Sequence, residues 1–210
     1  MVNKKLFLFD FDGTIANSLA AAVEAFNIVG PKLGCKPVDT KSLPKLLQGK
    51  SEDLMREHNL ARWKLPLLVL GVRRRLKQKL GDIHPQPGMI EVLRELKRRG
   101  VKVGIVTTNS ETNVDRFFAQ HAVSDVYDFV VSYLHIFGKH AALTQVLKHE
   151  HLNPAQAVYI GDEVRDIEAA KRAGILSVAV TWGFQPQTTL EAAKPDGLVS
   201  TPSQLLEDNF

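Results

Sequence analysis

Short apolar runs alternate with longer stretches of helical periodicity along most of the chain. The apolar runs have strand length and occur six times, at residues 6–9, 101–108, 128–133, 157–161, 175–181 and, more weakly, 196–200. Helical patterns separate them, at residues 87–100, 110–121, 139–152 and 163–174. Most of the runs are apolar throughout, as expected for strands that are covered on both faces. The pattern predicts an α/β fold with a parallel sheet between layers of helices.

One segment interrupts this alternation. It follows the first apolar run, contains no convincing strand, and has helical patterns at residues 17–30, 51–60 and 65–81. Gly30 and Gly81 are expected to end the first and last of these helices. We therefore expect an α/β core made of residues 1–15 and 86–210, with an all-helical subdomain, residues 16–85, inserted into it.

Composition restricts the class of protein. Hydrophobic residues make up 44% of the chain and charged residues 24%, which is ordinary for a globular domain. No apolar run approaches the roughly 20 residues of a membrane-spanning helix, and the run near the start is too short for a secretion signal. Cys35 is the single cysteine, so the chain cannot form an internal disulfide. We expect a cytoplasmic protein without a membrane partner.

The net charge of +4 is distributed unevenly. Residues 15–85 contain 13 Lys and Arg against 6 Asp and Glu. A basic segment suits either nucleic acid or a small anionic substrate. Because aromatic residues are not regularly interleaved with the basic ones, as single-strand binding would need, we expect a small anionic substrate and no nucleic acid. Candidate contacts, among which the sequence does not choose, are Lys45, Lys50, Arg56 and Arg73 to Arg75, although the last three also suit a solvated helix face.

Polar side chains follow the predicted strands at the points where these end. Because the carboxyl ends of parallel strands share one edge of the sheet, where ligands bind, these side chains should converge. Clustered carboxylates need a cation, and their hard oxygens suit Mg²⁺. A hydroxyl and a lysine suit a phosphoryl group, so the set indicates phosphoryl transfer. It comprises Asp10 and Asp12, Thr107 and Thr108, Lys139, and Asp162 and Asp166.

Four short motifs carry these residues: "DFDGT" at 10–14, "IVTTN" at 105–109, "GK" at 138–139 and "GDEVRDIEAAKRAG" at 161–174. In this order and spacing they resemble the four motifs of the haloacid dehalogenase superfamily. The inserted segment is similar to the helical cap of its phosphoglycolate-phosphatase and β-phosphoglucomutase branch. The resemblance spans nearly the whole chain and implies a Rossmann-like core. Asp12 and the acidic last motif mark the phosphatase and mutase type, so dehalogenation is not implied.

The resemblance also implies a role for each residue. Asp10 would be the nucleophile that forms an aspartyl-phosphate, and Asp12 the general acid and base. Mg²⁺ would be held by the Asp10 carboxylate, the Asp12 backbone carbonyl and the Asp162 carboxylate, with Asp166 acting on it through a bound water. The phosphoryl oxygens would be bound by the Thr107 hydroxyl, the Thr108 amide and Lys139.

The chain departs from the family pattern at two positions. Asn17 stands where an acid is common, which affects the start of the cap, and His140 stands where a proline often follows the lysine. Neither touches the chemistry. Trp182, after the fifth apolar run, suits a wall of the site and simple packing about equally.

Three functions follow as hypotheses. The leading one is a Mg²⁺-dependent phosphatase, monomer or homodimer, acting on a small phosphorylated metabolite such as phosphoglycolate. The first alternative is a phosphosugar mutase of the β-phosphoglucomutase type, which returns the phosphoryl group to the sugar. The second is a non-catalytic regulatory protein of the same fold. Such a protein is expected to lack at least one of five residues, all of which are present: Asp10, Asp12, Thr107, Lys139 and Asp162.

Overall fold

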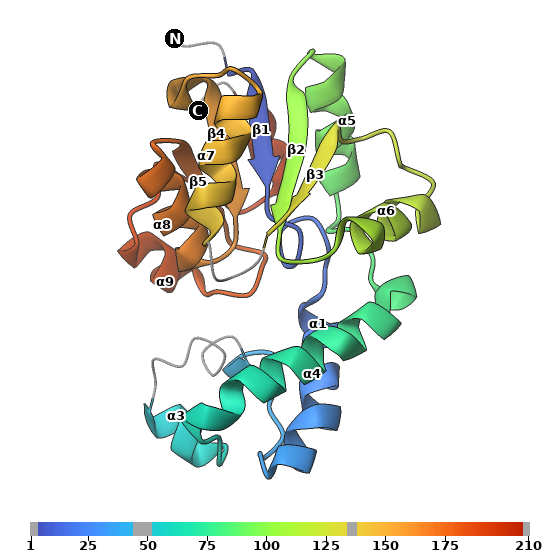
Figure 1. The fold of residues 1–210 in the computed structure, drawn as a ribbon, viewed down its shortest axis with the longest axis vertical. Helices are drawn as coiled ribbons and strands as arrows, with labels where there is room; N and C mark the ends of the chain where they lie inside the picture. The colour runs from blue at the N-terminus through green and yellow to red at the C-terminus, as the bar shows by residue number, and fades with distance from the viewer. Residues whose placement is uncertain (1–3, 44–51, 134–137, 208–210) are drawn as a thin grey trace. The chain divides into compact units, whose positions relative to one another are not determined.

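The computed structural model describes residues 4–43, 52–133 and 138–207 of the 210-residue chain. Its internal contacts divide the chain into two compact units, one made of residues 1–17 and 84–210 and the other of residues 18–83. Within the described residues, no helix is both long enough and apolar enough to cross a membrane. The larger unit has the α/β fold that the sequence pattern predicts (Figure 1).

A six-stranded sheet forms the centre of the larger unit. All its neighbouring strands are parallel, in the order β3-β2-β1-β4-β5-β6. Its strands are β1 Leu6–Phe9, β2 Lys102–Thr107, β3 Phe129–Ser132, β4 Ala157–Gly161, β5 Leu176–Val180 and β6 Gly197–Val199. The chain starts at the middle strand, runs outward to β3, and then returns to build the other half from β4. The reversal lies between β1 and β4, and the crevice at the carboxyl ends of such strands is the usual ligand site of this topology.

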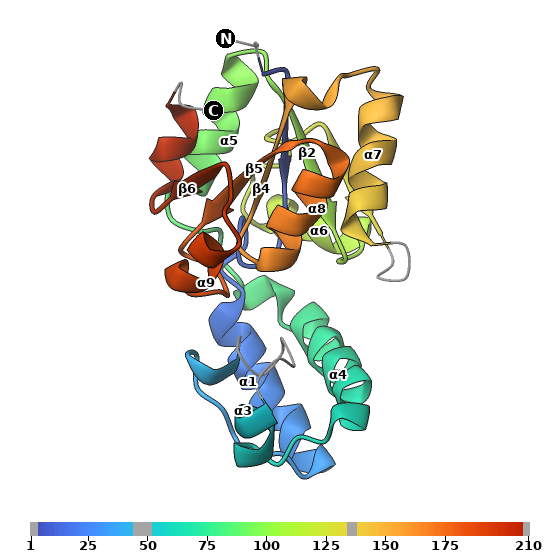
Figure 2. The same cartoon turned by 90° about the vertical axis from the view of Figure 1, so that its left-hand side faces the viewer.

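Helices cover both faces of this sheet. They are α5 Met89–Arg98, α6 Glu111–Gln120, α7 Lys139–His149, α8 Val164–Ala173 and α9 Gln187–Ala192. Figure 2 shows α7 and α8 on the opposite side of the sheet from α5. On the α7 and α8 side, Leu6 and Leu8 of β1 pack in one buried cluster with Leu143 and Ala170 of the two helices. Because successive strand residues face opposite ways, Phe7 and Phe9 belong to the other layer.

The predicted strands and helices of the core are confirmed: β1 and β4 have the predicted bounds, and the other elements are shorter than predicted by at most three residues at either end. Ser110 accepts the Asn113 N–H at the start of α6, and Gly174 adopts a left-handed conformation, φ +70°, at the end of α8. The short helix α9 was not predicted from the sequence. Among its six residues Leu190 is the buried one, so no periodic apolar stripe marks it.

The smaller unit is entirely helical in its described part. It contains α1 Leu19–Val29, α3 Glu52–Glu57 and α4 Leu65–Gln78, with short 3₁₀ turns at Gly30–Leu33, Arg62–Lys64 and Leu80–Asp82. α1 packs against α4 where Gly71 approaches Val29 closely: a Cβ on Gly71 would lie 2.6 Å from Val29 Cγ1. This close approach explains a glycine in the middle of a helix.

One helix end in the smaller unit differs from the prediction. α4 ends at Gln78 rather than at Gly81, because the backbone of Lys79 leaves the helical region and Gly81 lies in the following 3₁₀ turn. Ser18 occupies the N-cap position of α1 but makes no side-chain cap bond, because its backbone is helical (φ −94°, ψ −2°) rather than extended. Lys45 and Lys50 lie outside the described residues, as does the side chain of Arg73.

The two connections between the units are tied to each other at the edge of the larger one. Ala16 and Pro85 form an antiparallel bridge. The Asn17 N–H donates to the His84 carbonyl at 2.9 Å, and the Gln86 N–H donates to the Ile15 carbonyl at 2.8 Å. The two connecting segments, at residues 15–17 and 84–86, are therefore hydrogen-bonded to each other.

Candidate active site

The end of β1 places Asp10 at the centre of the sheet edge. The Asp10 N–H donates to the Ile160 carbonyl at 2.8 Å, which continues the pairing with β4 one residue past the strand. The Asp10 side chain is buried, and its Oδ1 accepts the Phe11 N–H at 2.9 Å. Phe11 is fully buried and packs edge-on against Phe117, with ring centroids 5.0 Å apart. The buried Phe11 side chain thus fixes the backbone between the two aspartates, Asp10 and Asp12.

The turn after Asp12 passes directly over Asp162. Gly13 has φ +85°, and a Cβ at this position would lie 2.2 Å from Asp162 Oδ2, so both conformation and space require glycine. The next residue, Thr14, donates its buried hydroxyl to Asp162 Oδ1 at 2.8 Å. These contacts join the loops after β1 and β4, which are 148 residues apart in the sequence.

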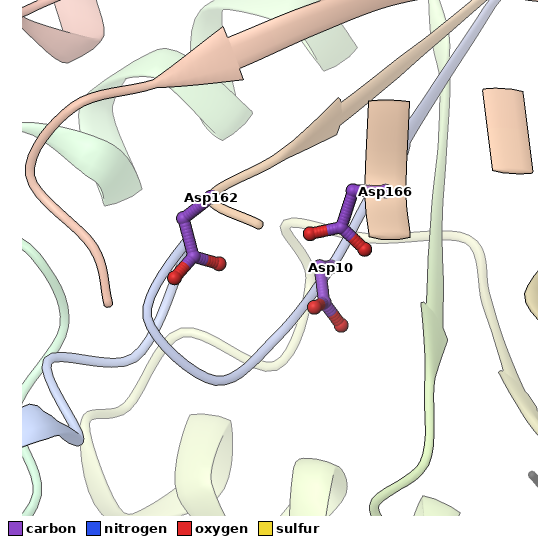
Figure 3. Close-up of side chains that lie close together, drawn as sticks. All are labelled: Asp10, Asp162 and Asp166. Atoms are coloured by element: carbon purple, nitrogen blue, oxygen red, sulfur yellow. The ribbon is translucent and has the colours of Figure 1, made fainter. Parts of the chain in front are cut away.

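Three buried carboxylates meet at this edge. One oxygen each of Asp10, Asp162 and Asp166 lies within 4.8 Å of the others. Figure 3 shows them gathered from the end of β1, the end of β4 and the first turn of α8. Burial, followed by the charges of Glu163, Asp166 and Asp10, raises the pKa of Asp162 well above its usual range. Burial also raises the pKa of Asp166, against the opposing effect of Lys139.

Such a cluster suits a divalent cation. Like charges buried together are costly unless they are protonated or neutralised, and a hard cation with oxygen ligands neutralises them directly. The oxygens already accept other hydrogen bonds: the Phe184 N–H reaches Asp162 Oδ2 at 2.7 Å, and the Glu163 N–H reaches Asp166 Oδ2 at 3.0 Å. Each carboxylate oxygen has two lone pairs, so these bonds orient the group and leave room for a metal ligand bond.

Lys139 brings a buried positive charge next to the carboxylates. It is the first residue of α7, directly after Gly138, and its ammonium lies 3.0 Å from Asp10 Oδ2 while also forming an ion pair with Asp166. It lies 5.2 Å and 5.9 Å from the ring centroids of Tyr159 and Tyr133. Burial by itself would lower the pKa of Lys139, but the carboxylates of Asp10 and Asp166 outweigh it and raise this pKa well above the ordinary lysine value. The lysine is therefore charged at any working pH.

Thr107 and Thr108 lie where β2 ends. The register pairs Phe9 with Ile105, so Thr107 lies two residues further along β2 at the same edge as the aspartates. Thr107 is almost fully buried, and its hydroxyl oxygen accepts the Asn109 N–H at 3.0 Å. Since a hydroxyl has one hydrogen to donate, this bond leaves that hydrogen for an acceptor in the site. Thr108 is half-buried in the same loop.

The structure brings the predicted residues together in two groups. In the first group, Asp10, Asp162 and Asp166 each have an oxygen within 4.8 Å of the others, and Lys139 forms ion pairs with Asp10 and Asp166. The Asp12 carboxylate is connected differently, because its Oδ2 lies 3.4 Å from the side-chain nitrogen of Asn109 in the loop after Thr107. Asp12 and Thr107 are thus linked through Asn109.

Sequence reasoning missed two contributors. Thr14 and Asn109 stand inside the quoted motifs, but nothing in their spacing indicates which partner each one meets. The loop after β5, from which the sequence offered Trp182 as a wall residue, contributes as well: the Phe184 N–H binds Asp162, and a Cβ on Gly183 would lie 2.2 Å from the Asp162 Cβ. In that loop Trp182 donates its ring N–H to the Thr14 carbonyl at 3.0 Å, so it braces the turn over Asp162.

Comparison with known proteins agrees with this geometry. The family model of haloacid dehalogenase-like hydrolases matches residues 7–180. A phosphoglycolate phosphatase of Synechococcus elongatus is 36% identical over 200 residues, covering 95% of this chain and 94% of its own. A pyrophosphatase, PpaX of Bacillus thuringiensis, is 27% identical and covers 95% and 93%.

A solved structure has the same fold. The haloacid dehalogenase-like hydrolase SP0104 from Streptococcus pneumoniae superimposes with a TM-score of 0.82 at 25% identity, covering 98% of each chain. The family model spans most of this chain, and the phosphoglycolate phosphatase matches it nearly end to end. The chain therefore belongs to the haloacid dehalogenase-like hydrolase family and is an enzyme of its phosphatase type.

Proposed function

We propose that this chain is a Mg²⁺-dependent phosphatase that hydrolyses a small phosphomonoester, of the phosphoglycolate kind, through an aspartyl-phosphate on Asp10. The observation that carries the proposal is the buried group of Asp10, Asp162 and Asp166, with the Lys139 ammonium 3.0 Å from Asp10 Oδ2. A carboxylate that is buried, oriented and neutralised by neighbouring cations is suited to attack phosphorus, because no water shell has to be removed first.

The first step is the attack of the Asp10 carboxylate on phosphorus. The new bond joins an Asp10 oxygen to phosphorus, and the bond from phosphorus to the leaving oxygen breaks. Asp12 gives its proton to that oxygen. In the second step Asp12 takes a proton from water, whose oxygen attacks phosphorus, so phosphate leaves and Asp10 is regenerated. Two carboxyl groups with different tasks are thus needed at positions 10 and 12.

Lys139 and the end of β2 hold the phosphoryl group. The Lys139 charge faces the equatorial oxygens, whose negative charge spreads in the transition state. The Thr107 hydroxyl hydrogen donates to one of those oxygens, because its oxygen already accepts the Asn109 N–H. The backbone amide of Thr108 assists. These groups are fixed before substrate binds, so little reorganisation is needed during the reaction.

The residues that would hold Mg²⁺ are the carboxylates of Asp10 and Asp162 and the backbone carbonyl of Asp12, with Asp166 acting through a bound water. When bound, the ion supplies positive charge to the phosphoryl oxygens and to the nucleophile. Thr14 and the Phe184 N–H orient the Asp162 carboxylate for this purpose.

The substrate is argued from the relatives and from charge. The relative that is 36% identical to this chain is named a phosphoglycolate phosphatase, and the basic excess of residues 15–85 suits a substrate with a second anionic group. We propose that this helical segment acts as a cap that selects the substrate. Pyrophosphate is the second candidate, because several relatives are named pyrophosphatases. The mutase alternative can be told apart from a phosphatase by experiment, because a mutase would pass the phosphoryl group to a sugar rather than to water.

The test is phosphate release from a panel that contains 2-phosphoglycolate, inorganic pyrophosphate and hexose phosphates, with and without Mg²⁺. The proposal predicts the highest kcat/KM on 2-phosphoglycolate, loss of activity with a chelator, and recovery when Mg²⁺ is returned. Higher activity on pyrophosphate would favour the second candidate. Transfer of label from a sugar phosphate to a product sugar, without free phosphate, would overturn the hydrolase assignment in favour of the mutase.

A further inference from the structure

We propose that Asn109 is a positioning residue for proton transfer by Asp12: its side-chain amide donates to Asp12 Oδ2 and so sets the orientation of the Asp12 carboxyl group toward the leaving group. This inference rests on the proposed function, in which Asp12 is the general acid. It assigns a specific task to Asn109, which stands in one of the sequence motifs without a stated role.

The hydrogen bonds of Asn109 determine which of its side-chain atoms faces Asp12. Its Oδ1 accepts from the Asn113 side-chain amide at 2.7 Å and from the Ser110 N–H at 3.0 Å. The oxygen and nitrogen of an amide are otherwise hard to distinguish, but an oxygen held by two donors cannot be the nitrogen. The atom 3.4 Å from Asp12 Oδ2 is therefore the donor, Nδ2.

Three elements hold Asn109 in place. Its N–H donates to the Thr107 hydroxyl at the end of β2, and its carbonyl accepts the Ser132 hydroxyl, at the end of β3, at 2.7 Å. Asn113, in the first turn of α6, is buried with 5% exposure, and its N–H is accepted by the Ser110 cap. A side chain with this support is fixed more firmly than an ordinary loop residue, which is what a positioning role requires.

The chemical consequence follows from the fact that an amide N–H can only donate. A protonated carboxyl group presents its carbonyl oxygen to such a donor more readily than its hydroxyl oxygen. With Oδ2 facing Asn109, this hydrogen bond favours placing the acid's proton on the other oxygen of Asp12. The distance of 3.4 Å exceeds the usual value of about 2.9–3.0 Å, as is common in catalytic hydrogen bonds before substrate binds.

The test uses two phosphomonoesters that differ in their need for an acid. The leaving group of an alkyl phosphate such as 2-phosphoglycolate is an alkoxide, which needs a proton from the general acid. The leaving group of p-nitrophenyl phosphate is a stable phenolate, which hardly needs one. The measured quantity is kcat/KM, because it covers phosphoryl transfer and not the later hydrolysis of the aspartyl-phosphate. If the Asp12 carboxyl group loses its orientation, kcat/KM should therefore fall more for the alkyl phosphate than for p-nitrophenyl phosphate.

The decisive variant is Asn109→Asp. It keeps the oxygen that accepts from Asn113 and Ser110, but it replaces the donor facing Asp12 with an acceptor. We expect kcat/KM to fall about tenfold to a hundredfold for the alkyl phosphate and by less than about threefold for p-nitrophenyl phosphate. Asn113→Ala, which lets the Asn109 amide rotate, should show the same selectivity to a smaller extent. Equal losses on both substrates, or no loss on the alkyl phosphate, would contradict the inference.

Two controls separate this inference from its premise. Ser132→Ala removes a hydrogen bond to the same loop without touching the amide, so it should show no selectivity; a selective loss there would assign the effect to loop structure. Asp12→Ala tests the premise. If it lowers kcat/KM equally for both substrates, the acid assignment fails. If it is selective while Asn109→Asp is not, Asp12 remains the acid and only the role of Asn109 fails.

Discussion

At the scale of single residues, the site is organised by hydrogen bonds to acids rather than by the acids alone. Each oxygen of Asp162 accepts a donor, from the Thr14 hydroxyl and the Phe184 N–H, and Asp166 is held by Lys139 and the Glu163 N–H. Buried carboxylates need such partners, and the partners also fix their orientation. The residues that orient the acids should therefore matter nearly as much as the acids themselves.

Thr14→Val tests this orientation. The substitution conserves shape but removes the hydroxyl that donates to Asp162 Oδ1. We expect the Mg²⁺ concentration needed for half-maximal activity to rise about 10- to 100-fold, because outer hydrogen bonds of this kind tune metal affinity. Thr14→Ser should restore most of the affinity. A Thr14→Val enzyme with wild-type Mg²⁺ dependence would show that the hydroxyl does not support the metal site.

Lys139→Ala tests the buried counter-charge. Removing it takes away the ammonium that forms ion pairs with Asp10 and Asp166, and we expect kcat to fall at least about 100-fold, as for loss of one transition-state contact. Lys148→Ala is the matched control, because Lys148 is exposed on the same helix, α7. Comparable activity of the two variants under saturating substrate would remove Lys139 from the mechanism.

At the scale of helices and strands, the elements were predictable where the sequence pattern is local. β1 and β4 have the expected bounds because each is a buried, largely apolar run that is followed directly by an aspartate. The predicted end of α4 at Gly81 was wrong, because the helix already ends at Gln78. α9 was not predicted, because a six-residue helix with one buried side chain has no detectable hydrophobic periodicity.

Gly71→Ala tests the contact between α1 and α4. Alanine normally favours a helix over glycine, by about 0.5–1 kcal/mol. Here the added Cβ would lie 2.6 Å from Val29 Cγ1, and a β-branched side chain cannot easily move away. We expect a net destabilisation of about 1–3 kcal/mol in urea unfolding, as for overpacking.

The double variant Gly71→Ala/Val29→Ala should recover part of the lost stability, because the second substitution removes the Val29 methyl groups that clash with the new Cβ. A single Gly71→Ala variant that is more stable than the wild type would contradict the close approach of the two helices.

Glu95 near the end of α5 gives a pH-dependent prediction. Its hydrogen bonds with Arg98 and Arg99 lower its pKa from 4.5 to about 2. A pKa that is lower in the folded state contributes stability above the unfolded value of 4.5 and loses it as the pH falls toward 2. The stability difference between wild type and Glu95→Gln should therefore be largest near pH 6 and shrink from about pH 5 downward. Urea midpoints at pH 6, 4 and 3 measure it; a pH-independent difference would argue against the pairing.

At the scale of the whole molecule, the fold explains how residues far apart in sequence form one site. The chain order from β1 outward, and then from β4 outward, brings Asp10 and Asp162 to neighbouring strand ends. Motif spacing predicted that the acids converge, and the resemblance supplied their roles. The contacts of Thr14 with Asp162 and of Asn109 with Asp12 join residues 148 and 97 positions apart, and no local pattern specifies them. Such pairings depend on loop geometry that emerges only once the sheet is assembled.

The central claim is that the Asp10 carboxylate forms a covalent bond to the transferred phosphoryl group, and trapping that bond tests it most directly. The enzyme is mixed with substrate and Mg²⁺, quenched in acid during turnover, digested, and examined by mass spectrometry. The account predicts a phosphorylated peptide modified at Asp10, no such peptide in Asp10→Asn, and no phosphate release by that variant. A phosphorylated residue elsewhere, or full activity of Asp10→Asn, would contradict it.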